Sequence, residues 1–147
     1  MTERRLRVAI GILALAGTGI AAYLTYVRAT GGSYACTTGG CEKVQSSAYA
    51  EIIGIPVAVI GLVGYVAIGA TALVAGEAAA VLGAALALGG FAFSVYLLYL
   101  QPAVIDAICV WCVASEGVMT VLFALMLLRL RLVSKGDISE AGSSVRP

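Results

Sequence analysis

Residues 78–105 read AAAVLGAALALGGFAFSVYLLYLQPAVI, a run of 28 residues without a charged side chain. A helix of about 20 apolar residues already crosses the ~30 Å hydrocarbon core of a bilayer. Two further uncharged runs cover residues 8–27 and 52–76, and between residues 107 and 128 the only charge is Glu116. The pattern therefore predicts an integral membrane protein.

The composition agrees with this prediction. Of 147 residues, 61% are hydrophobic, 12% are charged and none is histidine. A soluble domain has about 25% charged residues. The composition therefore excludes a water-soluble enzyme, a disordered chain and a nucleic-acid reader. The lack of histidine also excludes haem proteins with histidine ligands and most zinc hydrolases.

Because a backbone in lipid must satisfy its own hydrogen bonds, the apolar segments are expected to be helices. We predict an all-α membrane protein in which one domain, residues 1–128, is followed by a polar tail, residues 129–147. Its four membrane helices are expected at about residues 8–27, 52–75, 78–100 and 107–128. The longest connection is the loop 28–51. Small residues are expected to let the helices approach closely; they include Gly54, Ala58, Gly61 and Gly64.

The basic residues predict the orientation in the membrane. Seven of the nine lie near the two chain ends: Arg4, Arg5, Arg7, Arg129, Arg131, Lys135 and Arg146. Four spans place both chain ends on one side of the membrane, and the positive-inside rule predicts that this side is cytoplasmic. We therefore expect loop 28–51 on the extracytoplasmic side of the plasma membrane. The first segment is also compatible with a signal peptide, but its apolar run exceeds the usual 7–15 residues.

The four cysteines form two close pairs on the predicted outer side, where disulfides persist. Cys36 and Cys41 lie in the loop, whereas Cys109 and Cys112 open the last helix with a Cys-Val-Trp-Cys motif. A helix N-terminus stabilises a thiolate, and this spacing is typical of redox centres. Asp106 is a candidate cap for this helix, but its charge opposes a lowered thiol pKa. The alternatives are two structural disulfides or a zinc site.

A redox relay in a membrane needs an electron acceptor. Without haem ligands or a nucleotide motif, the natural acceptor is a lipid-soluble quinone such as menaquinone, ubiquinone or a vitamin K-type quinone. Glu116 is the only ionisable residue deep in a predicted span and lies one helical turn after Cys112. We therefore expect Glu116 to hydrogen-bond the quinone or to relay protons to it. The alternative is a protonated Glu116 bonded to a neighbouring helix.

Two stretches resemble the vitamin K epoxide reductase family. Cys41-Glu-Lys-Val-Gln-Ser-Ser-Ala-Tyr-Ala with Gly54-Ile-Pro-Val-Ala resembles the family's loop cysteine, serine pair and second-helix entry. Ser94-Val-Tyr-Leu followed by Cys109-Val-Trp-Cys112 resembles its third helix and redox motif. The resemblance implies a four-transmembrane-helix bundle around a quinone, with the extracytoplasmic loop as a lid over the pocket.

The resemblance also implies roles for individual residues. Cys36 would exchange with a thioredoxin-like protein, Cys41 would pass electrons to Cys109, and Cys112 would reduce the quinone. Ser47 would support the redox centre. The quinone contacts would be Cys112, Ser94 and Tyr96, together with Glu116, which is expected from its position in the span.

The expected partner is a separate extracytoplasmic protein, because many bacterial members carry a fused thioredoxin-like domain and this chain stops at Pro147. Animal members carry a tyrosine at the position of Glu116, which weakens the expectation that vitamin K epoxide is a substrate. Two other hypotheses about function remain open. One is a DsbB-type thiol oxidase of different fold, and the other is a non-enzymatic metal-binding or structural membrane protein.

Overall fold

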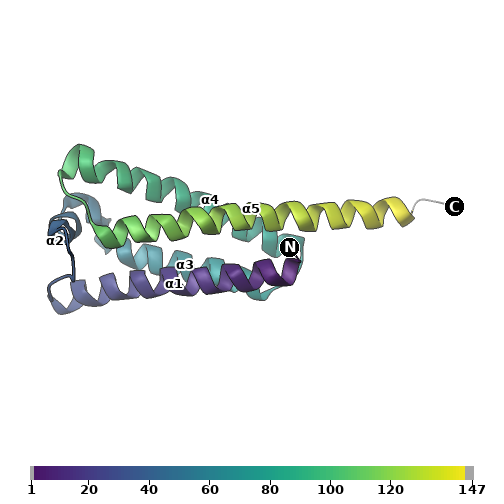
Figure 1. The fold of residues 1–147 in the computed structure, drawn as a ribbon, viewed down its shortest axis with the longest axis horizontal. Helices are drawn as coiled ribbons and strands as arrows, with labels where there is room; N and C mark the ends of the chain where they lie inside the picture. The colour runs from purple at the N-terminus through teal and green to yellow at the C-terminus, as the bar shows by residue number, and fades with distance from the viewer. Residues whose placement is uncertain (1, 145–147) are drawn as a thin grey trace.

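The computed structural model describes residues 2–144, with side chains up to Gly136. Its long helices lie side by side (Figure 1). They are α1 (Glu3–Thr30), α3 (Val57–Leu73), α4 (Glu77–Leu100) and α5 (Val110–Ser144). Helix α1 packs on α3 and α5, and α4 packs on the same two helices. The helices therefore enclose a common interior.

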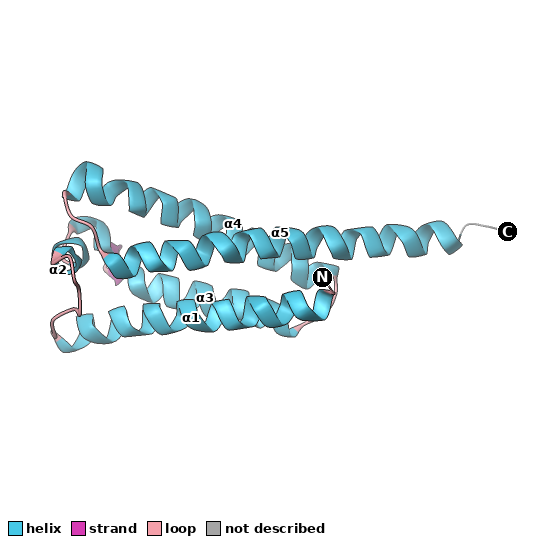
Figure 2. Ribbon diagram, in the orientation of Figure 1, coloured by secondary structure: helices cyan, strands magenta, loops and turns pink. Residues whose placement is uncertain are grey.

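The short elements gather at one end of this bundle (Figure 2). They are helix α2 (Gly40–Gln45), the 3-10 turn η1 (Ala48–Ala50), strands β1 (Glu51–Ile52) and β2 (Ile55–Pro56), and the π-helical turn η2 (Gln101–Ile105). Strands β1 and β2 form an antiparallel hairpin. The chain begins at the opposite end, toward which α5 also extends (Figure 1).

Three helical segments of the described chain are long and apolar enough to cross a membrane: Glu3–Thr30, Glu77–Ile105 and Val110–Gly136. Helix α3 is equally apolar but has only 17 residues. At 1.5 Å per residue it is about 25 Å long, which is less than the hydrocarbon thickness. The structure thus confirms a mostly helical chain, and three of its helices, near the first, third and fourth predicted positions, are candidates for crossing a membrane.

Two helix boundaries differ from the predicted ones. The second helix was expected from residue 52 but begins at Val57, because the hairpin turn holds Ile53 and Gly54 at positive φ and Pro56 precedes the helix. Two consecutive positive φ angles suit a tight hairpin turn. The fourth helix begins at Val110 rather than 107 and continues to Ser144. The predicted tail is therefore helical as far as the chain is described, and its Arg146 lies outside the described residues.

Two arginines satisfy the end of α3. The guanidinium of Arg129 donates to the carbonyls of Thr71 and Val74 at 2.8 and 2.6 Å, although the sequence pattern placed this residue in a polar tail. Arg7 donates to the two carbonyls between them, those of Ala72 and Leu73, at 2.7 and 2.5 Å. The last four carbonyls of a helix have no partner within it, and in lipid each costs several kcal/mol. Helix α3 can therefore end inside the bundle.

Arg129 has 0% exposure, so its charged guanidinium is buried inside the bundle. Its nearest acidic group is Glu3, whose carboxylate lies 3.6 Å from the guanidinium. Removing a buried arginine leaves its partners unsatisfied, which costs more than losing a surface ion pair. Arg129 therefore has a structural role.

We expect Arg129→Met to lower the free energy of unfolding by ~3 kcal/mol and the Tm by roughly 10 °C, because two carbonyls lose their donor. Thermal unfolding in detergent measures the change. Arg131→Met is the matched control, since Arg131 is exposed on the same helix. Equal losses in the two variants would contradict the capping role.

Candidate active site

The loop after α1 docks on the residues that precede α5. Gly40 lies so close that a Cβ on it would be 2.3 Å from the carbonyl oxygen of Ile108. The Thr38 hydroxyl donates to the same carbonyl at 3.0 Å. The indole of Trp111 donates to the carbonyl of Ala35 at 2.7 Å. These contacts hold the loop cysteines over the N-terminus of α5.

The two cysteine pairs meet through one member of each. Cys36 and Cys41 form a disulfide, while Cys109 and Cys112 are free thiols. Cys41 and Cys109 both have 0% exposure and belong to one buried cluster with Val44. Cys36 is only partly buried, at the outer side of this cluster. The arrangement puts a thiol of the CxxC motif against the inner end of the loop disulfide.

Cys109 is the residue that caps α5. Its sulfur accepts the backbone N–H of Cys112 at 3.4 Å, and its own N–H donates to the side-chain oxygen of Gln101 at 2.7 Å. Asp106 was the candidate cap, but it lies in the left-handed region at φ 52°, and its main-chain carbonyl accepts from Lys43. A sulfur at the cap position lies at the positive end of the helix dipole.

The electrostatics of Cys109 follow from this position, just before α5. A hydrogen bond from the Cys112 side chain lowers the pKa of the Cys109 thiol to about 7. The backbone N–H groups of Cys112 and Trp111 also lower it, whereas burial raises it. A lowered pKa raises the fraction of thiolate near neutral pH, and the thiolate is the form that attacks disulfides.

A cavity of about 360 Å³ lies below the loop, between the long helices. This volume is within the range of small-molecule sites. Its walls are mainly apolar, and the polar side chains on it include Gln45, Ser47, Ser94, Gln101 and Ser115. The Cys112 thiol also lies on the wall. The CxxC motif therefore separates the loop disulfide from a largely apolar chamber.

Glycines of α3 form part of this cavity rather than a helix contact. Nothing lies within 4 Å of a Cβ built on Gly61 or Gly64, and both residues line the chamber together with Ala58. The sequence-based interpretation of close helix approach was therefore wrong at Gly61 and Gly64. It describes Gly17 instead, where a Cβ would meet the Tyr65 ring at 2.3 Å.

The predicted quinone contacts lie in different environments. Ser94 and Cys112 line the cavity, as does Ser47, whose hydroxyl donates to the Val44 carbonyl at 2.7 Å. Tyr96 is described by the structure but is 51% exposed and is not among the residues around the chamber. Glu116 is also absent from the chamber wall as described.

Glu116 is nevertheless a buried acid. It is 8% exposed, and the Thr120 hydroxyl donates to one carboxyl oxygen at 3.3 Å. The other oxygen has no hydrogen-bond partner among the described residues. The adjacent Ser115 does line the cavity, and its hydroxyl lies 2.7 Å from that of Tyr65. Glu116 is therefore next to a wall residue in the chain but is not itself among the residues that line the cavity.

Two site residues were missed by the sequence reasoning. Gln45 is 8% exposed, and its amide nitrogen donates to the Cys112 sulfur at 3.6 Å. Gln101 is 2% exposed and anchors the backbone of Cys109. The available signals were the position of Gln45 four residues after Cys41 and the presence of an amide in the uncharged run 78–105. Among the side chains that the structure describes, residues 2–136, no group of three or more acidic or cysteine side chains could hold a metal ion.

Comparison with known proteins agrees with this arrangement. Residues 8–127 match the family model described as the vitamin K epoxide reductase family. The chain is also similar to the thiol-disulfide oxidoreductase LTO1 of Arabidopsis thaliana, with 33% identity over 124 residues, covering 76% of this chain and 33% of the plant protein. It thus spans about a third of the length of that relative. Both cysteine pairs and the cavity lie within the matched residues, and the chain belongs to the vitamin K epoxide reductase family.

Proposed function

We propose that this protein is a membrane thiol-disulfide oxidoreductase that passes electrons from a reduced thioredoxin-like protein to a quinone. One observation carries the proposal. The free Cys109–Cys112 pair lies between a loop disulfide and an apolar cavity, with Cys109 against Cys41 and Cys112 on the cavity wall. The family and the similarity to a plant thiol-disulfide oxidoreductase support the same chemistry.

The proposed cycle begins at the loop. A thiolate of the partner attacks Cys36, and its second thiolate releases the mixed disulfide, so the partner is oxidised and Cys36 and Cys41 are reduced. Cys41 then attacks Cys109 of an oxidised Cys109–Cys112 pair. A Cys41–Cys109 bond forms, and the electron pair leaves on Cys112. Cys36 finally displaces Cys109 from Cys41, which restores the loop disulfide.

The pairing in the structure corresponds to the end of these exchanges, with the loop disulfide closed and two thiols beside the cavity. A bound quinone would accept two electrons and two protons from this dithiol. The wall fits such a ligand, since it is mainly apolar and carries a few polar groups. The Gln101 amide is one of them, and the bond from the Cys109 N–H fixes its oxygen. The net product outside the cytoplasm is a disulfide in the partner.

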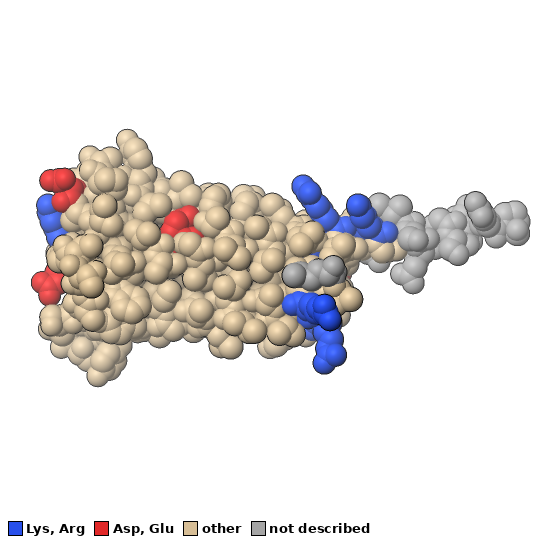
Figure 3. All heavy atoms as spheres, in the orientation of Figure 1, with Lys and Arg blue, Asp and Glu red and all other residues tan. Residues whose placement is uncertain are grey.

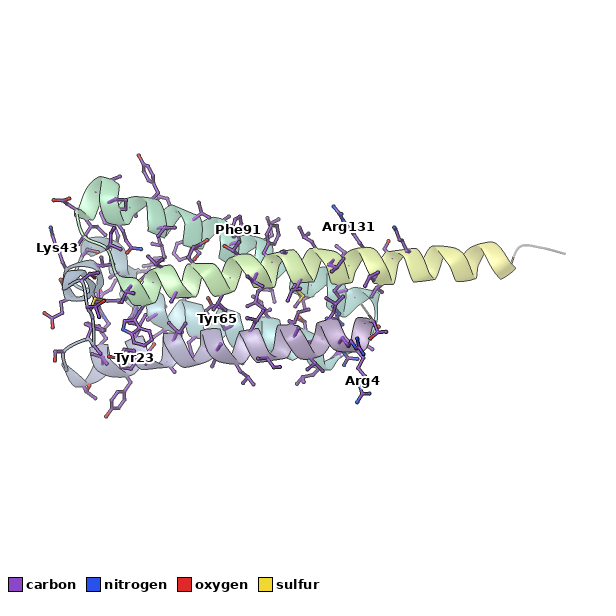
Figure 4. The ribbon with its side chains drawn as sticks, in the orientation of Figure 1. Arg4, Tyr23, Lys43, Tyr65, Phe91 and Arg131 are labelled. Carbon is purple, nitrogen blue, oxygen red and sulfur yellow. A yellow bond between two sulfur atoms is a disulfide. The ribbon has the colours of Figure 1, made fainter. Side chains whose placement is uncertain are left out.

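The distribution of charge supports the proposed topology. Basic side chains gather at the end of the bundle where α1 begins (Figure 3). Arg4 and Arg131 lie at this end, whereas Lys43 lies at the α2 end (Figure 4). If α3 spans together with the three longer apolar helices, the positive-inside rule places both chain ends in the cytoplasm and the cysteines outside. A location in the plasma membrane is part of the same proposal.

We further propose that Glu116 supplies or relays a proton. Its unpartnered carboxyl oxygen and its absence from the residues that line the cavity favour a relay over direct contact with the ligand. Buried acids of this kind in a membrane segment are costly and are often functional. Ser94 and Ser47 are proposed to contact or support the ligand site, and Tyr96 is the weakest of these candidates because it is half exposed.

The thiol contact is testable by trapping. We expect Cys36→Ser/Cys112→Ser to form a Cys41–Cys109 disulfide in most molecules under a mild oxidant, because the remaining thiols share one buried cluster. Mass spectrometry of proteolytic fragments identifies the bond. In the matched variant Cys41→Ser/Cys112→Ser, the remaining Cys36 is expected to stay free. An equal yield of Cys36–Cys109 would contradict the proposed order of exchange.

The cavity is testable with purified protein in detergent under anaerobic conditions. With a reduced thioredoxin-like donor and a soluble menaquinone or ubiquinone analogue, we expect Gly64→Leu to raise the KM for quinone roughly tenfold, because the new side chain fills the chamber. Quinol formation is followed by absorbance. Gly19→Leu is the control, since Gly19 is an exposed helical glycine with nothing within 4 Å of a Cβ.

In the same assay, Cys112→Ala is expected to abolish quinol formation. If folded wild-type protein reduced no quinone analogue, the proposed acceptor would be wrong. A Gly64→Leu variant with an unchanged KM would instead move the binding site away from this cavity.

We expect Glu116→Gln to lower the rate of quinol formation at least tenfold and to remove one limb of its pH profile, because the amide cannot transfer a proton. The turnover number measured across pH tests this. Thr120→Val is a companion variant, since it removes the hydroxyl bonded to the carboxyl group but keeps the acid. An unaltered pH profile in Glu116→Gln would show that Glu116 is a structural residue.

A further inference from the structure

The face of α2 matches the N-terminal end of α5. Cys41 and Gln45 are four residues apart and therefore lie on one face of α2, and both are buried. Cys109 and Cys112 are three residues apart at the start of α5 and also share a face. Cys41 lies in one cluster with Cys109, and the Gln45 amide donates to the Cys112 sulfur at 3.6 Å. Each thiol of the CxxC motif thus has its own partner on α2.

The main chain of Gln45 is held independently of the cavity. The Arg28 guanidinium, from the last turn of α1, donates to the Gln45 carbonyl and to the carboxylate of Glu51. These bonds tie the end of α2 to the end of α1 and to strand β1. The Gln45 side chain is therefore presented to Cys112 from a fixed backbone.

The chemistry at Cys112 calls for a donor of this kind. When Cys41 attacks Cys109 of the oxidised motif, the Cys109–Cys112 bond breaks and Cys112 leaves as a thiolate. A thiolate can only accept hydrogen bonds, so the amide presents its N–H groups to it. Such a charge-assisted bond is about twice as strong as a neutral one and is strengthened further by low local dielectric.

We propose that Gln45 is a positioning residue that stabilises the Cys112 thiolate, the leaving group of the exchange between the two cysteine pairs. This inference rests on the proposed function. It adds that the loop delivers both the attacking thiol and the donor for the leaving thiol, from one helix face. Exchange is then coupled to docking of α2, because a displaced loop removes both groups together.

The test uses the full chain with Cys36, Cys41 and Cys109 replaced by serine, which leaves Cys112 as its single thiol. Thiolate formation is titrated by ultraviolet absorbance in detergent, without quinone. We expect Gln45→Leu to raise the midpoint by about one pH unit, a roughly tenfold loss of thiolate at a fixed pH below it. Gln45→Glu, which replaces the donor with a carboxylate, should raise the midpoint at least as much.

Ser46→Ala is the matched control, because Ser46 follows Gln45 and its hydroxyl is exposed, with its only bond to the Lys43 carbonyl among the described residues. The midpoint of this variant should equal that of the parent. An unchanged midpoint in Gln45→Leu would overturn the inference. Docking of the loop is verified by adding Gln45→Leu to Cys36→Ser/Cys112→Ser, which should still form the Cys41–Cys109 disulfide.

The titration separates this inference from the proposed function. If Gln45→Leu shifts the midpoint but wild-type protein reduces no quinone, the role of Gln45 as hydrogen-bond donor is supported and the proposed electron acceptor is wrong. If quinone is reduced and the midpoint does not move, only the role of Gln45 is lost.

Discussion

The close contact between Gly40 and the backbone of Ile108 determines where the loop can lie. Any side chain at residue 40 would overlap the Ile108 carbonyl, so only glycine lets α2 reach the start of α5. From this contact follow the burial of Cys41 against Cys109 and the reach of Gln45 to Cys112. The same loop contributes Val44 and Ser47 to the cavity wall. One backbone approach therefore organises both the thiol contact and the cover of the chamber.

At both ends of the bundle, free backbone groups of helix termini have hydrogen-bond partners, as a bilayer would require of a membrane protein. At the loop end, Gln101 accepts the N–H of Cys109, and the Cys109 sulfur accepts that of Cys112. At the other end, Arg7 and Arg129 donate hydrogen bonds to the last carbonyls of α3. These arrangements let α3 be short and let α5 begin directly after Cys109. At the loop end, the site thus includes a helix terminus whose free backbone groups already have hydrogen-bond partners.

Much of the fold could be predicted from the sequence, because uncharged runs of membrane length leave the backbone little choice but helix. The four cysteines were also visible, since their spacing is local. Gln45 and Arg129 could not be found in this way, because their importance depends on partners 67 and 58 residues away in the chain. The glycines of α3 were misread for a related reason. A glycine that permits close packing and one that leaves a space look identical in sequence, and only the neighbouring helices distinguish Gly17 from Gly64.

Burial imposes an order on the proposed electron path. Cys41 and Cys109 have 0% exposure, so external thiols cannot reach the junction between the pairs. Cys36 is accessible at the loop and Cys112 faces the cavity, so each pair has one sulfur at the buried contact between Cys41 and Cys109 and one sulfur directed away from it. In the proposed mechanism, a partner dithiol would therefore react at Cys36, and a lipid-soluble acceptor would meet Cys112. The buried thiol contact would keep these two reactants apart in that mechanism, and electron transfer between them would depend on the docked loop.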